Sequence, residues 1–176
     1  MSLRRLTIGL AAAVAVLALD QASKALARTH LAAEIVEIGP FLNLRLGFNT
    51  GVTFGLLGDG GGFGRWALVA VTSAVVVWLL AWMWREARVA VVVPRGLIVG
   101  GALGNILDRL RHGAVTDFID LHVGAASWPT FNLADSAIVT GVGLLLLASL
   151  RGSGRPAPAT EAGRRKTTIH GKGTRP

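Results

Sequence analysis

The stretch "PRGLIVGGALGNILDRLRHGAVTDFID" (Pro94–Asp120) joins an apolar run to a group of charged and amide side chains. Its first part, Pro94–Leu110, approaches the length of about 20 mainly apolar residues with which a helix crosses the hydrocarbon core of a bilayer. Glycine recurs there at every fourth residue, at Gly96, Gly100 and Gly104. Small residues at this spacing let two membrane helices approach closely. The stretch therefore predicts a packed transmembrane helix that ends in polar residues.

The composition predicts a membrane protein in which this helix is one of four. Of the 176 residues 52% are hydrophobic and the mean hydropathy is +0.55, which is too apolar for an ordinary soluble domain. Three more segments have the length and composition of a membrane span: Leu6–Ala27, Arg65–Trp84 and Leu133–Leu150. A cleaved signal peptide is the alternative for the first segment. Its apolar run continues into "LDQASKALA" without a short hydrophobic core, which favours a retained helix.

The formal net charge is +8, and the distribution of this charge indicates topology and not nucleic-acid binding. Four spans place both termini on one side, together with the connection between the second and third spans. Twelve of the 18 basic residues lie in these three parts of the chain, which are therefore cytoplasmic by the positive-inside rule. Residues 151–176 are basic and rich in Gly, Pro and Thr, so we expect a disordered cytoplasmic tail and no nucleic-acid partner.

The segment between the first and second spans, about residues 30–64, is predicted to form a small β-sheet on the outer membrane surface. The letters "LNLRL" (Leu42–Leu46) alternate strictly between apolar and polar, which is typical of a half-buried strand. A turn follows at Asn49–Gly51, and the β-favouring residues Val52 and Thr53 come next. The predicted fold class is thus mainly α, with four transmembrane helices and a small outer sheet.

Ionisable residues inside membrane spans are costly, so each of them is a functional candidate. Asp20 and Lys24 lie four residues apart, acid before base, which favours an ion pair. This pair is either functional or a self-neutralising pair whose lysine extends outward to the interface. Asn105, Asp108 and Arg109 fall on one face of the third span, as a structural network or as a clamp for a backbone or headgroup. The histidines are scattered at positions 30, 112, 122 and 170 and cysteine is absent, so no metal site is predicted.

Asp117 and Asp135 flank the connection between the third and fourth spans, at the outer ends of the two helices. Two carboxylates that share a site cannot both ionise easily, so the pair can hold one proton between them. Such a pair can activate water for peptide hydrolysis without a cofactor, as in aspartic proteases. Two alternatives remain open from the residues alone. Asp135 is also suited to cap the fourth helix, and Asp120 is either a solvated loop acid or as good a candidate as Asp117.

A small proton-coupled transporter is the rival function, with Asp20, Asp108, Asp117 and Asp135 as a carboxylate relay. A relay predicts acids that are spread across the depth of the membrane. The acids of this chain instead gather at the outer ends of the helices, which favours an enzyme.

Four blocks of the chain together resemble the lipoprotein signal peptidases of bacteria, also called signal peptidase II. They are "DQASKALA", "NTGVTFGLL", "GGALGNILDRLRHGAVTDFID" and "FNLADSA", in the family's order and spacing within Leu6–Leu150. In the second block, Val52 and Thr53 replace the small residues that are usual in the family. The resemblance implies an aspartic endopeptidase domain over residues 1–150. We expect it to be a monomer among the lipids of the bacterial cytoplasmic (inner) membrane. The implied substrates are prolipoproteins, which the family cleaves before a cysteine that carries a diacylglyceryl group.

Carried over residue by residue, the resemblance places the catalytic pair at Asp117 and Asp135 and leaves Asp120 outside the family pattern. Supporting polar residues map to Asp20, Lys24, Asn49, Gly51, Asn105, Arg109 and Asn132. Among these, Asn49 and Arg109 are expected to hold the substrate backbone near the scissile bond. The resemblance implies no metal and no cofactor.

Overall fold

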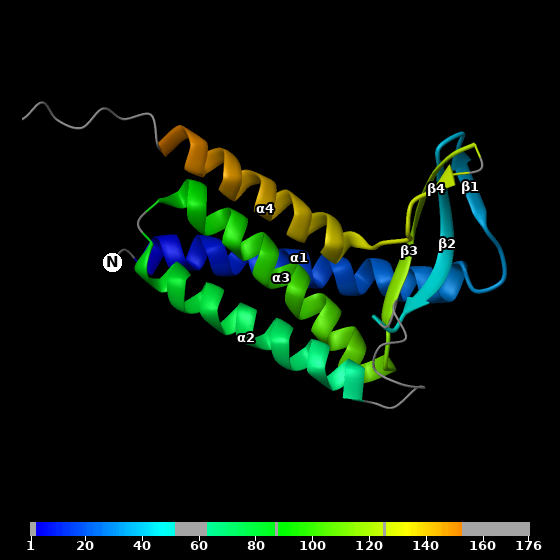
Figure 1. Cartoon of the computed structure of the whole chain (residues 1–176), viewed down its shortest axis with the longest axis horizontal. Coiled ribbons are helices and arrows are strands. Elements are labelled where there is room, and N and C mark those ends of the chain that lie inside the picture. Colours follow the sequence, from blue (N-terminus) through cyan, green and yellow to red (C-terminus); the bar gives the residue numbers. More distant parts are fainter. Residues whose placement is uncertain (1–2, 52–62, 87, 125, 153–176) are drawn as a thin grey trace, which may run out of the picture.

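The described residues of the chain fold as a bundle of four long helices with a small sheet at one end (Figure 1). The computed structural model describes residues 3–51, 63–86, 88–124 and 126–152. The helices are α1 (Leu3–His30), α2 (Phe63–Arg85), α3 (Val89–His112) and α4 (Leu133–Gly152). Each of the four is long and apolar enough to cross a membrane, which confirms the predicted spans. The predicted C-terminal tail lies outside the described residues from position 153 onward.

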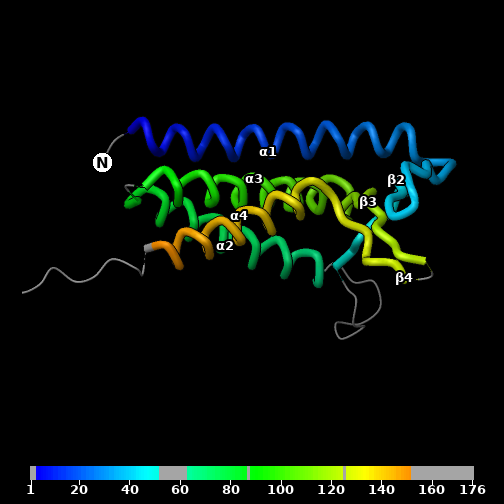
Figure 2. Tube along the Cα trace, turned by 90° about the horizontal axis from the view of Figure 1, so that it is seen from above, coloured from blue at the N-terminus to red at the C-terminus, as the bar shows by residue number. Residues whose placement is uncertain are grey.

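Helix α3 is the central element of the bundle and packs against the other three helices (Figure 2). Of its most apolar 18-residue window 72% is buried inside the protein, against 17% or less for the other helices. The other three helices therefore turn most of their apolar surface outward, as expected of helices that face lipid. Two polar residues near the end of α3, Asn105 and Asp108, consequently lie in the protein interior, whereas Arg111 and His112 are exposed.

The glycines of α3 explain how the helices approach so closely. A methyl group added at Gly96 would collide with the backbone oxygen of Gly9 in α1, and one at Gly100 would collide with that of Ala13. Gly101, on another face, would meet the backbone oxygen of Ala134 in α4. The backbones of α1, α3 and α4 are therefore in direct contact, which confirms the prediction made from the glycine spacing.

Helix α3 begins at Val89, five residues before the predicted start at Pro94. Proline lacks the N–H that a helix interior uses, so a helix start at Pro94 was the simplest expectation. Burial outweighs this preference: Val92 is fully buried and Val91 is 6% exposed. The extra turn adds apolar contacts that the interrupted backbone hydrogen bond does not cancel.

The sheet consists of four antiparallel strands in the order β1 (Val36–Gly39), β2 (Leu42–Asn49), β3 (Val115–Val123) and β4 (Ala126–Ser127). The described part of the predicted segment, residues 30–51 and 63–64, supplies the first two. The connection between α3 and α4, predicted as a loop, supplies the other two, which corrects that prediction. The reason is non-local, since β3 pairs with β2 from 70 positions away, with Gly47 opposite Asp117. Val52 and Thr53 lie outside the described residues.

Candidate active site

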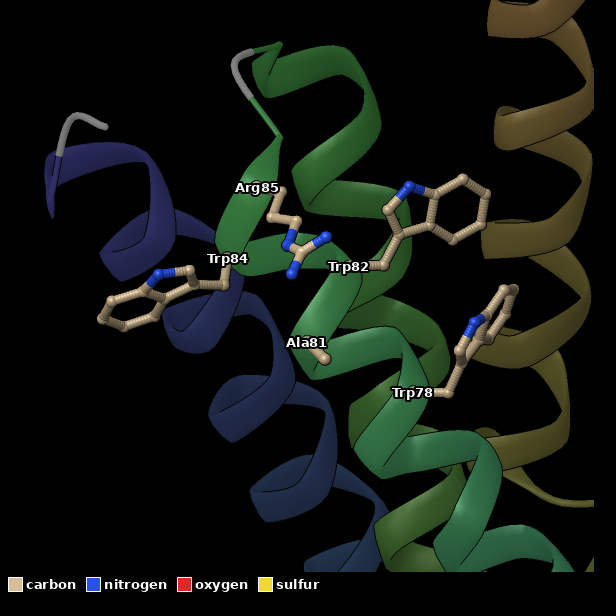
Figure 3. A pocket seen from close by; sticks show the side chains of 5 residues that line it. All are labelled: Trp78, Ala81, Trp82, Trp84 and Arg85. Carbon is tan, nitrogen blue, oxygen red and sulfur yellow. The ribbon is translucent and has the colours of Figure 1, made fainter.

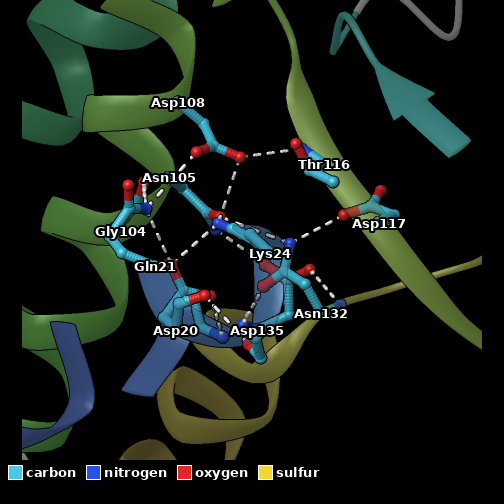
Figure 4. A network of polar contacts seen from close by, with 12 residues as sticks. Asp20, Gln21, Lys24, Gly104, Asn105, Asp108, Thr116, Asp117, Asn132 and Asp135 are labelled. Atoms are coloured by element: carbon cyan, nitrogen blue, oxygen red, sulfur yellow. Dashed lines mark hydrogen bonds and ion pairs between the residues drawn. The ribbon is translucent and has the colours of Figure 1, made fainter. Parts of the chain in front are cut away.

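Two carboxylates, Asp117 and Asp135, meet at one asparagine where the sheet joins the helices (Figure 4). Asp117 lies near the start of β3, and its Oδ1 accepts a hydrogen bond of 2.6 Å from Nδ2 of Asn132. Asp135 lies in the first turn of α4, and its backbone N–H donates to Oδ1 of the same asparagine at 3.0 Å. The chain between α3 and α4 thus returns to the same end of the bundle, and one amide side chain holds both acids.

Asn105 of α3 provides a second link between the two acids. Its Nδ2 donates to Oδ1 of Asp135 at 2.8 Å. Its Oδ1 accepts from Nδ2 of Asn132 at 3.4 Å. A continuous series of hydrogen bonds therefore connects Asp117 to Asp135 through two amides. Such a series restricts the positions of both carboxylates more than separate hydrogen bonds would.

The predicted capping of α4 is real, and it is shared between two residues. Asn132 is the N-cap, because its Oδ1 accepts the backbone N–H of Asp135 three positions further on. In return Oδ2 of Asp135 accepts the backbone N–H of Asn132 at 3.3 Å. This reciprocal arrangement is a capping box. Capping occupies one oxygen of Asp135 and the other faces Asn105, so the cap also orients this carboxylate within the site.

The Asp117 carboxyl is almost fully buried, with 1% of the residue exposed. Burial raises the pKa of Asp117 above its ordinary value, and the nearby carboxylate of Asp135 raises it further. Hydrogen bonds from the side chains of Asn132 and Asn49 and the charge of Lys24 oppose this rise in pKa without cancelling it. The neutral, protonated form of Asp117 is therefore favoured relative to a carboxyl in water.

A pocket of about 580 Å³ reaches Asp117 from the sheet. Its other lining residues come from β2 and from the segment that leads into α4: Arg45, Gly47, Phe48, Asn49, Thr50, Ser127, Trp128, Pro129 and Thr130. Asp117 thus borders this pocket, while its carboxyl is hydrogen-bonded to Asn132 at the start of α4.

Asp120 differs from Asp117 in its surroundings. It is 8% exposed within β3, so the expectation of a solvated loop acid is wrong. Its Oδ2 lies 3.4 Å from Nε of Arg45, the ion pair of two neighbouring strands. Side chains alternate along a strand, so residues 117 and 120 project to opposite faces. This alternation separates the two acids, and only Asp117 contacts Asn132 at the start of α4.

The Asp20–Lys24 pair is completely buried. This excludes the alternative in which the side chain of Lys24 extends outward to the membrane interface. Nζ of Lys24 lies 2.9 Å from Oδ2 of Asp20 and 3.4 Å from Oδ2 of Asp108. It also donates to Oδ1 of Asn105 at 3.0 Å. One cation therefore holds two carboxylates and the amide that contacts Asp135. Burial follows from the position of α1 against α3, where the amine has acceptors on three sides.

Asp20 also contacts α4 directly. Its Oδ1 accepts the backbone N–H of Ala134 at 3.0 Å, and this N–H is one of those that a helix start leaves without a partner inside the helix. Gly104 of α3 makes room for this contact, because a methyl group there would collide with the Asp20 carboxylate. Asp20 thus fixes the first turn of α4, to which Asp135 belongs.

Asp108 holds the start of β3 together with three residues that the sequence did not single out: Arg28, Gln21 and Thr116. Oδ2 of Asp108 accepts the backbone N–H of Thr116 at 2.9 Å, and NH1 of Arg28 donates to Oγ1 of Thr116 at 2.7 Å. Gln21 donates to Oδ1 of Asp108 at 3.3 Å. Because Thr116 directly precedes Asp117, these contacts position the buried acid. The spacing of Arg28, four residues beyond Lys24 on one helix face, was a usable signal. The role of Thr116 depends on where β3 lies against the helices, and no pattern in the sequence indicated it.

The remaining predicted residues, Asn49, Gly51 and Arg109, meet at the turn after β2. The side-chain oxygen of Asn49 accepts the N–H of Gly51 at 2.8 Å, and Gly51 has a φ of 76°. A side chain at Gly51 would be strained there and would also collide with Leu68 of α2. NH2 of Arg109 would lie 3.5 Å from such a methyl group. The guanidinium of Arg109 therefore lies against this turn, within electrostatic reach of both Asp117 and Asp135.

Buried donors at this site are not all used. In the described part of the chain, Nε of Arg109 is buried without a hydrogen-bond partner. A buried donor of this kind is costly unless a ligand or water accepts it. Within the same residues, no group of three or more His, Cys, Asp or Glu side chains is placed to hold a metal ion. The site therefore combines two linked carboxylates with a cation that can receive a carbonyl oxygen.

The fold and this site together define a class of protein: a multi-pass membrane protein with a carboxylate site where its helices meet a small sheet. Comparison with known proteins identifies the family. A sequence model of the family "Signal peptidase (SPase) II" matches residues 12–151. The chain belongs to the signal peptidase II family, which makes it a membrane-bound peptidase.

Individual relatives agree with this assignment. The lipoprotein signal peptidase of Methylorubrum extorquens (strain PA1) is 48% identical over 158 residues, which cover 87% of this chain and 91% of the relative. The lipoprotein signal peptidase of Azoarcus sp. (strain BH72) is 45% identical over 154 residues, which cover 86% of this chain and 85% of the relative. A solved bacterial membrane enzyme superposes with a TM-score of 0.72 at 31% identity, covering 81% of this chain and 92% of the other. The comparisons give no support to the proton-coupled transporter.

Proposed function

We propose that this protein is an aspartic endopeptidase that removes signal peptides from prolipoproteins, cleaving before the diacylglyceryl-modified cysteine. One observation carries the proposal: Asp117 and Asp135 are linked through Asn132 and Asn105 beside an accessible pocket. The relatives named above are lipoprotein signal peptidases, which supports the substrate class. The two carboxylates then activate water as the nucleophile, so the reaction requires no activated side-chain nucleophile.

In the proposed mechanism one proton is shared by the pair, as two neighbouring carboxylates in a buried site favour. Asp117 holds this proton, because burial favours its neutral form. Asp135 is the carboxyl that takes the proton of water, and each of its oxygens accepts an N–H that orients it. The two apparent pKa values of this site belong to the pair of carboxyls and not to either residue alone.

Hydrolysis then proceeds in two steps. The ionised carboxylate takes a proton from water while the hydroxide oxygen bonds to the scissile carbonyl carbon. The protonated carboxyl donates its proton to the carbonyl oxygen. The tetrahedral intermediate collapses when the carboxyl that took the water proton passes it to the peptide nitrogen and the C–N bond breaks. The hydroxyl that received the other proton returns it, which restores the pair.

Two supporting residues are proposed to bind the substrate backbone. Arg109 offers a donor that has no partner among the described residues, and Asn49 lines the pocket beside Asp117. The site would lie near the outer face of the bacterial inner membrane, with both termini in the cytoplasm, as the distribution of basic residues favours. A monomer contains every residue of this proposed site.

The substrate class is tested with one peptide in two forms. We expect the purified protein in detergent to cleave a prolipoprotein peptide on the N-terminal side of its diacylglyceryl-modified cysteine. Mass spectrometry of the products identifies the cleaved bond. The same peptide without the lipid is expected to be cleaved much more slowly, because it lacks the group that anchors the cysteine in the membrane. Failure to cleave the lipid-modified peptide, or cleavage at another bond, would reject the proposed function.

The raised pKa of Asp117 predicts the pH dependence of turnover. Turnover needs one proton on the pair, so kcat falls as pH rises through this pKa, and it falls again at low pH when both acids are protonated. Replacing Asn49 by alanine removes a hydrogen bond that lowers the pKa of Asp117. The alkaline limb of kcat is therefore expected to move to higher pH in Asn49→Ala.

Asn43→Ala is the matched control for this shift. Asn43 lies on the same strand but opposite Asp120, so its replacement is expected to leave the alkaline limb in place. A limb that stays fixed or moves to lower pH in Asn49→Ala would refute the assignment of the proton to Asp117.

Thr116→Val tests the contacts at the start of β3. The change removes the hydroxyl that accepts from Arg28 but keeps the shape and the backbone hydrogen bond to Asp108. We expect kcat to fall on the order of 10-fold, because small displacements of a reacting group are costly. KM is expected to stay unchanged, because Thr116 does not line the pocket. Thr116→Ser restores the hydroxyl and should restore turnover, whereas a change in KM alone would count against a positioning role.

A further inference from the structure

A groove on the outer face of α2 is lined by residues of the last turns of this helix (Figure 3). This end of α2 lies opposite the sheet in the bundle (Figure 1). The groove has a volume of about 540 Å³ and is lined by Trp78, Ala81, Trp82, Trp84 and Arg85. In Figure 3, Trp78 and Trp82 stand on one side, toward α4, and Trp84 stands on the other. Ala81 lies between them, with Arg85 one turn further along the helix. We propose that this groove binds an anionic phospholipid, with an acyl chain along Ala81 and the phosphate at Arg85.

The aromatic wall of the groove is held in place by the protein interior. The guanidinium of Arg95 lies 3.9 Å from the ring centroid of Trp82, and this arginine is 2% exposed. On the other side, the rings of Trp78 and Trp82 lie 4.9 Å apart between centroids at an angle of 44°. Cation–π and aromatic contacts of this kind fix ring positions. A ligand that binds against the fixed rings of Trp78 and Trp82 loses less free energy to ordering the site.

The charges around the groove favour an anionic ligand. Glu86, next to Arg85 in the chain, is engaged with Arg88 at 3.2 Å and with Arg95 at 3.6 Å. Among the residues that the structure describes, no ion pair engages Arg85 itself, and it is exposed. An arginine donates well to phosphate oxygens in a bidentate geometry. A mainly apolar groove that ends in a cation matches an acyl chain with a negatively charged headgroup.

The position of the groove indicates where this lipid comes from. The groove lies on a membrane-spanning helix with its tryptophans 47–57% exposed, so its natural environment is the lipid bilayer. Arg85 lies at the end of α2, at the depth where tryptophan and arginine meet headgroups. The occupant is therefore a phospholipid of the leaflet at the end of the bundle where α1 begins and α4 ends, and the site is separate from the carboxylate site.

Fluorescence quenching by brominated lipids tests the proposal, because three of the five tryptophans line the groove. The full-length protein is placed in nanodiscs that contain phosphatidylglycerol or phosphatidylcholine with the same brominated acyl chains, diluted in unbrominated lipid. We expect half-maximal quenching at about five-fold less phosphatidylglycerol than phosphatidylcholine, as expected for one arginine near an anionic headgroup. Equal quenching by both lipids would overturn the proposal.

Three variants separate this groove from general attraction to the basic end of the bundle. Arg85→Gln should abolish the preference for phosphatidylglycerol. Ala81→Phe fills the floor of the groove at an exposed position and should reduce quenching by that lipid while the fold is retained. Arg88→Gln removes the same charge one turn away, at a residue paired with Glu86, and should leave the preference intact. A preference that survives Arg85→Gln, or one that Arg88→Gln abolishes equally, would reject the groove as the binding site.

Discussion

Lys24→Met is expected to destabilise the protein by about 3–5 kcal/mol, because removal of one partner leaves buried charges without compensation. The amine of Lys24 is completely buried and holds the carboxylates of Asp20 and Asp108, which are completely buried as well. The unbranched side chain of methionine is one atom shorter than that of lysine, so it fills most of the same space and packing changes little. Thermal unfolding in detergent micelles measures the loss of stability, and turnover should fall with it because the same amine holds Asn105.

A double variant distinguishes charge from packing. Asp20→Asn combined with Lys24→Met removes one buried anion together with the cation, so it should be more stable than Lys24→Met alone. An exposed ion pair contributes little to stability. In that case the two substitutions would have small and nearly additive effects, and the double variant would be no more stable than Lys24→Met. If Lys24→Met unfolds at the temperature of the unmodified protein, the buried network does not stabilise the fold through its charges.

The four helices were predictable because membrane spans depend on long apolar runs that any single sequence displays. Their contacts were predictable to the extent that the glycine spacing of α3 indicated close approach to a neighbour. The start of α3 was not predictable, because Pro94 favours a helix start at its own position. In the structure α3 begins at Val89, and this earlier start buries Val91 and Val92. Half of the sheet was also missed. The pairing of β3 with β2 joins residues far apart in sequence, and no local pattern encodes such pairing.

The candidate site, too, was predictable only in part. Asp20 and Lys24 were noticeable as charges in an apolar helix, but the direction of the lysine depends on the acceptors that α3 offers. The residues alone left Asp117 and Asp120 equal, and the family resemblance separated them. The structure adds a physical reason, since only Asp117 contacts the cap of α4. For Asp135, capping and the proposed catalysis proved compatible, because the two oxygens face different donors.

Replacing either acid of the pair by asparagine is expected to abolish cleavage, with kcat reduced about 10³-fold or more. Asp117→Asn keeps an oxygen that can accept from Asn132, so the fold is retained while the proton that the mechanism needs is lost. Asp135→Asn retains one acceptor oxygen where the carboxylate uses two, so it should also lose about 1 kcal/mol of stability through the weakened cap. Turnover of a lipid-modified peptide, with thermal unfolding as the check on folding, measures both effects.

One side-by-side assay tests the catalytic pair most directly: cleavage of the same diacylglyceryl-modified peptide by Asp117→Asn, Asp135→Asn and Asp120→Asn. Asp120 is the matched control, because it lies on the same strand as Asp117 but is paired with Arg45. We predict no measurable cleavage by the first two variants and substantial cleavage by the third. Cleavage that survives in folded Asp117→Asn or Asp135→Asn, or that disappears in folded Asp120→Asn alone, would contradict the assignment of Asp117 and Asp135 as the pair that activates water.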